Sequence, residues 1–173
     1  MKSPTISGAA IKIDFLPNLT SWRGKLLSGD PRGEAIHGTS FLRERRIVLD
    51  TELVNDWQEL SRILVHELFH FVWVRLGNPR RHSYQQLLHQ EITGNARGEL
   101  GWSSQWRKDS LKREDPLLRS RKWREYTAES FCDTAAYFYS NCGLHEEYTL
   151  SKRYRLKRSV WFEENAAAKL LRF

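Results

Sequence analysis

Residues 62–73, RILVHELFHFVW, are the stretch from which the fold of this chain can be worked out. They place His66 and His70 four positions apart, with Glu67 directly after the first histidine. Apolar residues surround all three and recur at spacings of three and four, which predicts an amphipathic helix that buries most of its surface. On such a helix, two imidazoles and a carboxylate are costly unless they have a metal ion or other polar partners.

The spacing of these three side chains suits a zinc site. Positions four apart on an α-helix differ by about 40° around its axis, so the two imidazoles project from one face and can bind one tetrahedral zinc ion. Glu67 lies about 100° round from His66, off the metal but within reach of a water bound to it. This HExxH pattern predicts His66 and His70 as zinc ligands and Glu67 as the general base. The alternative is a pair of structural histidines.

A catalytic zinc site normally takes three protein ligands, so a third must come from elsewhere in the chain. The candidates that follow the helix are His82, His89, Glu91, Glu99, Glu129 and His145. Glu129 and Asp133 lie four apart among small and apolar residues, on a predicted helix. We expect Glu129 to bind the metal and Asp133 to hydrogen-bond the far nitrogen of a ligand histidine. The alternative for this pair is an acidic stripe on a surface helix.

HELFH at 66–70 followed by ESFCD at 129–133 resembles the HExxH…ExxxD pattern of gluzincins, the thermolysin-type branch of the zinc metallopeptidases. The short chain, with strands ahead of the motif helix, is most similar to the compact, single-domain minigluzincins. The resemblance implies a zincin-like fold, a Zn²⁺ cofactor and hydrolysis of peptide bonds. It also implies an edge strand that binds an extended peptide or protein substrate by strand addition.

The resemblance covers about 36–77 and 124–142. Larger gluzincins have a His or Tyr that stabilises the oxyanion, and two residues are candidates for that role. Tyr137 lies two turns past Glu129, and His145 follows the end of the same predicted helix.

Two other interpretations remain open. With His82 as third ligand, the chain would resemble the SprT-like metallopeptidases, which act on DNA-bound proteins, but Glu129 and Asp133 would have no role. The second is a regulatory or nucleic-acid-associated binding module that keeps the zincin scaffold and uses metal for structure or sensing. The intact Glu67 favours the enzyme, since a structural site needs no base.

Strands come first in the hydrophobic pattern and helices follow, which predicts an α+β fold. Ile11, Ile13 and Phe15 alternate with polar residues in a predicted half-buried strand. We expect one zincin-like domain over 1–173, with a small twisted N-terminal sheet packed on the active-site helix and a mostly helical C-terminal part. Its expected segments are a strand-rich part at 9–50, the active-site helix at about 56–76, a helical insertion at about 80–118, a glutamate helix at about 119–142 and C-terminal helices at 145–173.

The composition is typical of a folded chain, with 40% hydrophobic residues among 173. No run of about 18 apolar residues predicts a membrane span, and the first residues do not match the pattern of a signal peptide, so we expect a cytoplasmic protein. The net charge of +7 comes largely from basic clusters at 106–124 and 152–158. The second cluster indicates an anionic partner more strongly, but nucleic-acid binding is not the favoured prediction. Three tryptophans, Trp102, Trp106 and Trp123, are expected to pack the insertion onto the core, and the alternative is that they line a substrate cleft.

Overall fold

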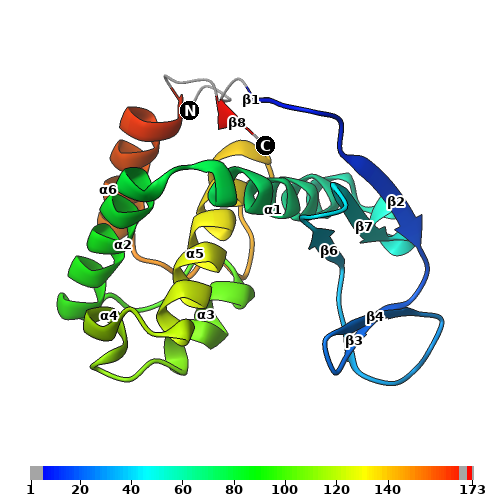
Figure 1. The fold of residues 1–173 in the computed structure, drawn as a ribbon, viewed down its shortest axis with the longest axis horizontal. Helices are drawn as coiled ribbons and strands as arrows, with labels where there is room; N and C mark the ends of the chain where they lie inside the picture. The colour runs from blue at the N-terminus through cyan, green and yellow to red at the C-terminus, as the bar shows by residue number, and fades with distance from the viewer. Residues whose placement is uncertain (1–5, 168–170, 173) are drawn as a thin grey trace.

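Strands come first along the chain and helices follow in the computed structural model, which describes residues 6–167 and 171–172 (Figure 1). The strands are β1 (Ile6–Ser7), β2 (Lys12–Leu16), β3 (Leu19–Trp22), β4 (Lys25–Ser28), β5 (Glu34–Ala35), β6 (Gly38–Phe41), β7 (Arg46–Asp50) and β8 (Leu171–Arg172). The helices are α1 (Trp57–Arg75), α2 (Asn78–Thr93), α3 (Trp102–Asp109), α4 (Asp115–Leu118), α5 (Arg121–Tyr139) and α6 (Lys152–Phe162). A 3₁₀-helix (Thr51–Asn55) precedes α1, and a π-helical turn (Glu163–Ala167) follows α6. The fold is therefore α+β, with a small N-terminal sheet and a mostly helical C-terminal part.

The sheet that faces α1 consists of β2, β7 and β6 in that order, with β2 parallel and β6 antiparallel to β7. Ile47 and Leu49 of β7 are buried against Phe71 of α1. Gly38, at the start of β6, allows a close approach, because a Cβ there would lie 2.9 Å from the Ile63 side chain of α1. The edge strand β6 therefore lies directly beside the helix that carries the histidines.

The predicted N-terminal strand forms as β2, but its apolar side chains are not well covered. Ile13 and Phe15 stay 44% and 41% exposed. They pair in register with Ile47 and Leu49 of β7, yet among the strands of this sheet α1 packs mainly against β6 and β7. As the outer strand on the other side of β7, β2 extends past the helix, so the prediction of a half-buried strand was wrong for these two residues.

A second three-stranded sheet, in the order β4-β3-β5, follows β2. Its strands lie in a segment where glycine and proline predict turns more clearly than strands. The backbone N–H of Leu19 donates to Oδ2 of Asp50, at 2.7 Å, and so joins β3 to the end of β7. This small sheet forms the lobe that carries β3 and β4 in Figure 1.

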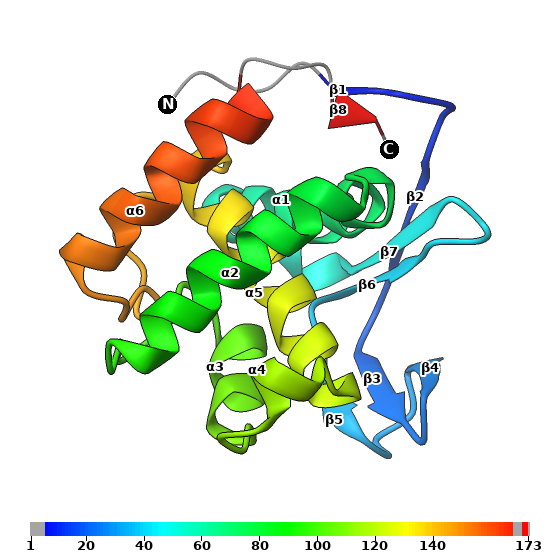
Figure 2. The same ribbon diagram turned by 60° about the vertical axis from the view of Figure 1, so that its left-hand side comes forward.

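The helical part is built around α1 and α5, which make the most extensive contact between any two elements of the described residues. Their shared core is aromatic, with Phe69 and Trp73 of α1 against Phe131 of α5. Tyr84 of α2 and Phe162 of α6 complete it, and Figure 2 shows α2 and α6 beside this helix pair. None of the described helices has both the length and the apolar run that crossing a lipid bilayer requires.

Local signals set the ends of α1. The carboxylate of Asp56 accepts hydrogen bonds from the backbone N–H groups of Gln58 and Glu59, which would otherwise have no partner in the first turn. Gly77, with φ of 81°, turns the chain after α1, and Pro79 lies in the first turn of α2. The helix therefore occupies 57–75, where the sequence predicts one at about 56–76.

A fully buried ion network joins α6 to α2 and to the loop before α3. Arg158 donates to Glu91 at 2.6 Å and to Glu99 at 2.8 Å, and all three residues are 0% exposed. Lys108 of α3 lies 3.1 Å from Glu99, and Tyr126 donates to it at 2.6 Å. Burial alone would raise the pKa of Glu99, but the charges of Arg158 and Lys108 outweigh it and lower the pKa. This network holds the loop that leads into α3.

The basic cluster at 152–158 is partly internal. Arg158 belongs to the buried network, and Arg155 donates to the backbone carbonyls of Leu150 and Tyr148. Lys152, Arg153 and Lys157 are exposed. Two of the five basic side chains that indicate an anionic partner therefore stabilise the fold.

Replacing Arg158 tests the importance of the network. Arg158→Met should lower the free energy of unfolding by about 3–5 kcal/mol at neutral pH, because it leaves two carboxylates buried without their partner. Glu99 has a lowered pKa in the fold, so this ionic contribution is present above the ordinary value of 4.5 and disappears as the pH falls below it. Urea denaturation at a series of pH values measures both effects.

Lys152→Met, at an exposed position of the same helix, is the control and should change stability by less than about 0.5 kcal/mol. Equal unfolding free energies for Arg158→Met and the wild type would contradict a stabilising role for the network.

Candidate metal centre

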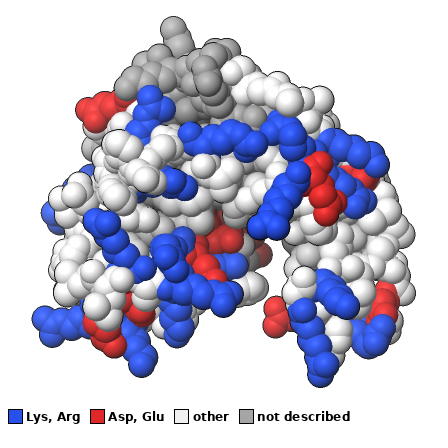
Figure 3. Space-filling model, in the orientation of Figure 1, with Lys and Arg blue, Asp and Glu red and all other residues white. Residues whose placement is uncertain are grey.

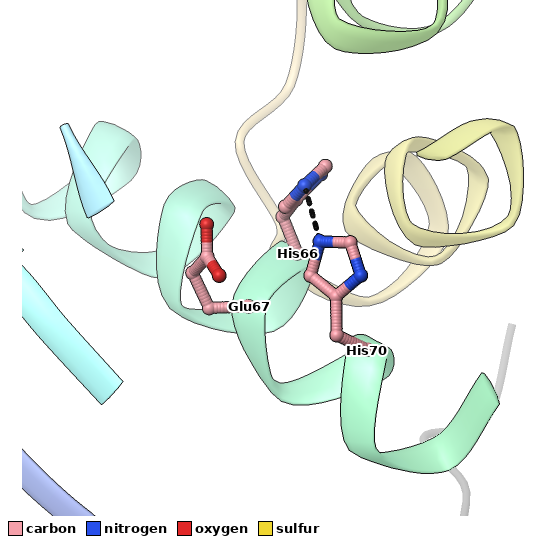
Figure 4. A group of neighbouring side chains, drawn as sticks. All are labelled: His66, Glu67 and His70. Carbon is pink, nitrogen blue, oxygen red and sulfur yellow. Dashed lines mark hydrogen bonds between the residues drawn. The ribbon is translucent and has the colours of Figure 1, made fainter. Parts of the chain in front are cut away.

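His66, Glu67 and His70 come together on one side of α1. The Nε2 atoms of the two histidines lie 3.2 Å apart, and the carboxylate of Glu67 lies beside the pair (Figure 4). Atoms able to bind a metal, one from each of the three residues, all lie within 4.8 Å of one another. His66 and Glu67 are buried and His70 is half-buried. This group could hold a metal ion.

Glu129 reaches the same point from α5. Its Oε2 lies 3.4 Å from Nε2 of His66 and 3.9 Å from Nε2 of His70. In a tetrahedral zinc site with bonds of about 2.0–2.1 Å, neighbouring ligand atoms are about 3.3–3.4 Å apart. The separations between the three side chains are close to that value, so His66, His70 and Glu129 fit a single metal ion.

Asp133, one turn beyond Glu129, fixes the orientation of His66. Its Oδ1 lies 2.7 Å from Nδ1 of His66, and its Oδ2 accepts a hydrogen bond from the backbone N–H of Ser104 at 3.0 Å. When Nδ1 carries the donated proton in a neutral ring, the lone pair of Nε2 faces His70 and Glu129. A Cβ at Gly101 would overlap the Asp133 carboxyl group, so only glycine lets this loop approach so closely.

The charges of the centre shift the pKa values of two of its members. Burial alone would raise the pKa of Glu129, but the hydrogen bond with His66 and the positive charges of His70, His66 and Arg107 lower it to about 2. Burial alone would lower the pKa of His66, but the charge and hydrogen bond of Asp133 raise it well above its usual value. A metal ion therefore competes with a proton for Nε2 of His66.

The carboxylate of Glu67 is held by the edge strand. The hydroxyl of Ser40, on β6, donates to Oε2 of Glu67 at 2.5 Å. The same hydroxyl lies 2.8 Å from the backbone carbonyl oxygen of Glu67. Ser40 thus joins β6 to α1 at Glu67, the residue that the sequence predicts as the general base.

A cleft opens onto these side chains. One cavity of about 360 Å³ is lined by both histidines, Glu67 and Glu129, and an adjoining one of about 250 Å³ also reaches His66 and Glu67. Residues of β6 form one wall and residues of α3 another. Figure 3 shows the surface hollowed between the helical part and the lobe of β3 and β4.

Trp102 and Trp106, two of the three tryptophans expected in the core, line this cleft. Trp102 and Trp106 are 39% and 66% exposed and line the smaller cavity, whereas Trp123 is 2% exposed and belongs to the aromatic core. The expectation that all three pack onto the core was therefore wrong for Trp102 and Trp106, because they lie on the face of α3 that points toward β6.

Arg107 of α3 also lines the larger cavity, and it was not among the expected site residues. Its Nη1 donates to the carbonyl of Ser103 at 2.8 Å, and its Nη2 lies 3.3 Å from Oε1 of Glu129. Glu129 thus contacts Arg107 with one oxygen and the histidines with the other. No local pattern relates Arg107 or Ser40 to the HExxH motif, since both come from separate elements.

The structure does not bring Tyr137 or His145 to the cleft. Eight residues along a helix rotate by about 80° beyond two full turns, so Tyr137 leaves the face of Glu129. Its ring packs on Tyr148, with centroids 4.9 Å apart. Nε2 of His145 lies 3.4 Å from Glu59, in a second group of potential ligands with Glu147.

Arg62 already occupies that second group. Its guanidinium donates to Glu59 at 2.5–2.7 Å and to Glu147 at 2.8–3.2 Å. A buried cation therefore contacts both carboxylates and offsets one of their two negative charges, so it already takes the place of a metal ion there.

His82 and His89 lie on α2, away from the cleft. His82 lines a cavity that includes Arg119, whose Nη1 is 3.5 Å from Nε2 of the histidine, and His89 lines the same cavity. Glu129, and not His82, is the residue that reaches His66 and His70.

Comparison of the chain with protein-family models, with curated proteins and with solved structures found no match. We therefore infer the function from the residues and the geometry of the centre.

Changing Asp133 tests the contact that orients His66. Asp133→Asn should lower the pKa of His66 in the metal-free protein, because the neighbouring negative charge that favours the imidazolium is removed. NMR titration of the histidine ring protons measures this. Glu125→Gln, at an exposed position of the same helix, is the control and should leave the pKa unchanged. An unaltered His66 titration in Asp133→Asn would contradict the assignment.

Proposed function

We propose that this chain is a zinc-dependent metallopeptidase of the gluzincin type, with a zincin-like fold. The observation that carries the proposal is the convergence of His66 Nε2, His70 Nε2 and Glu129 Oε2 at separations of 3.2–3.9 Å. These are two imidazoles and one carboxylate, a ligand set known from catalytic zinc sites that keep one position open. Glu67 lies beside them and is bonded to Ser40. A purely structural site would need no such base.

In this proposal Glu67 moves the proton. A bound zinc ion would supply Lewis acidity toward water and toward a substrate carbonyl. Glu67 accepts a proton from the attacking water and later donates it to the leaving amine. The hydroxyl of Ser40 donates a hydrogen bond to Oε2 of Glu67. This bond holds the carboxylate in one orientation and leaves Oε1 for the water.

Arg107 is the cation that lines the larger cavity of the cleft. Of its five N–H groups, one donates to Ser103 and one faces Glu129, which leaves three for a substrate. A guanidinium there would bind the carbonyl oxygen that becomes negative as water attacks, the role for which Tyr137 and His145 are not in place.

The free edge of β6 supports a peptide substrate. β6 is an edge strand of its sheet, and Gly38, Thr39 and Ser40 line the cleft beside His66 and Glu67. An extended peptide that pairs with this edge would place one of its carbonyls near the centre, with affinity from main-chain hydrogen bonds.

Metal content and Glu67 together test the proposal. The wild type should bind one zinc ion per chain and cleave members of a mixed peptide library. Glu67→Gln should keep the zinc and lose about 10²–10⁴-fold in kcat, because only the proton transfer is removed. Elemental analysis and mass spectrometry of the digests measure the two quantities.

Three further variants separate binding from catalysis. Glu129→Ala should weaken zinc affinity sharply, whereas His82→Ala should leave it unchanged. Arg107→Ala should retain zinc and lower kcat more than it raises KM, because its contact forms in the transition state. A wild type that holds zinc but cleaves no peptide would favour the regulatory binding module, and one that holds no zinc would contradict both functions.

A further inference from the structure

A separate cavity, on the far side of α3 from the metal centre, differs from the cleft in the residues that line it. It measures about 900 Å³ and lies between the end of α2, α3 and α4. This volume is within the range of sites for small ligands, about 300–1,000 Å³. None of the residues that line the cleft line this cavity.

The charged residues that line it are all basic. They come from three segments and are Arg97, Lys108, Lys112 and Arg113, and no Asp or Glu lines the cavity. An adjoining cavity, which shares His89 with the first, adds Arg119 and again has no acidic residue. Figure 3 shows Lys and Arg side chains gathered over this lower left part of the surface, where α2, α3 and α4 lie.

Two of these cations have an acidic neighbour: Lys108 pairs with Glu99, and the charge of Lys112 interacts with the Asp115 carboxylate. Glu99 is buried and bonded to Arg158. Of the cations that line the cavity, Glu99 contacts Lys108. The carboxylate of Asp115 accepts from the backbone N–H of Lys112. Within 6–167 and 171–172, Arg97 and Arg113 form no ion pair, although both are exposed at the cavity rim. Arg97 and Arg113, which line one cavity and have no ion-pair partner among these residues, attract a multivalent anion.

The floor of the cavity is apolar. Ile92, Ala96, Leu111, Pro116 and Leu117 line it, and Leu117 is 73% exposed. A ligand that fills the site therefore needs an uncharged body as well as its anionic groups. Inorganic phosphate alone would leave this surface uncovered.

We propose that this cavity binds a small phosphorylated molecule of nucleotide size. Its phosphates lie against Arg97, Lys112 and Arg113, and its uncharged body lies on the apolar floor. Arginine and lysine together suit phosphate oxygens, which accept several charge-assisted hydrogen bonds at once. A concave site of limited volume fits such a molecule better than a polymeric nucleic acid, which would follow an extended basic stripe.

Isothermal titration calorimetry with ATP, pyrophosphate and a single-stranded oligonucleotide tests this proposal. ATP should bind, and pyrophosphate should bind more weakly because it does not cover the floor. Arg97→Glu combined with Arg113→Glu should weaken ATP binding by about tenfold or more, since two charge-assisted contacts become repulsive. The control combines Lys25→Glu with Arg43→Glu, exposed residues outside every cavity described above, which change the net charge equally. It should weaken binding less than twofold.

One further variant excludes the metal centre as the binding site. His70→Ala removes a proposed metal ligand and should bind ATP as the wild type does, so a loss there would mean that phosphate had bound at the metal. That result would overturn the proposal. So would equal weakening in the two charge-reversed variants, binding of the oligonucleotide alone, or no binding of ATP at millimolar concentration.

Discussion

The hydrogen bond between Asp133 and His66 is the contact on which the rest of the centre depends. It joins α5 to α1, the two elements of the described residues that make the most extensive contact. The bond sets the direction of the His66 ring. The preceding turn of α5 places Oε2 of Glu129 3.4 Å from Nε2 of His66. Asp133 also accepts a hydrogen bond from the backbone N–H of Ser104, so one carboxylate joins α5 to both α1 and α3. A shift of α5 along α1 would separate Glu129 from His66 and His70.

Helix α3 connects the two sites of the molecule. It carries Arg107 into the cleft and Lys108 toward the cavity on its other side, since adjacent helical residues point about 100° apart. The start of α3 depends on Gly101, because a side chain there would overlap the Asp133 carboxylate. The ion pair between Glu99 and Arg158 holds the loop before α3. The buried ion network therefore supports the metal centre from a distance, without contacting a proposed ligand.

Short-range patterns made α1 and α5 predictable, because apolar periodicity and the spacing of His66, His70, Glu129 and Asp133 lie within single helices. Groups that meet only through tertiary packing gave no such signal. Arg107 and Ser40 come from elements far apart in the sequence, and no local spacing links them to the motif. The exposure of Ile13 and Phe15 depends on where α1 crosses the sheet, which alternation cannot reveal. In the basic cluster near the C-terminus, charge alone could not tell buried Arg158 from its exposed neighbours.

X-ray absorption spectroscopy of the zinc-loaded protein tests the proposed zinc centre. We predict one zinc ion per chain with only nitrogen and oxygen neighbours at about 2.0–2.1 Å, two of them imidazoles. Glu129→Ala should change this first shell, and Asp133→Asn should preserve its composition while weakening affinity. A sulfur neighbour, which would have to come from Cys132, Cys142 or Met1, or a single imidazole in the shell would contradict the proposed centre.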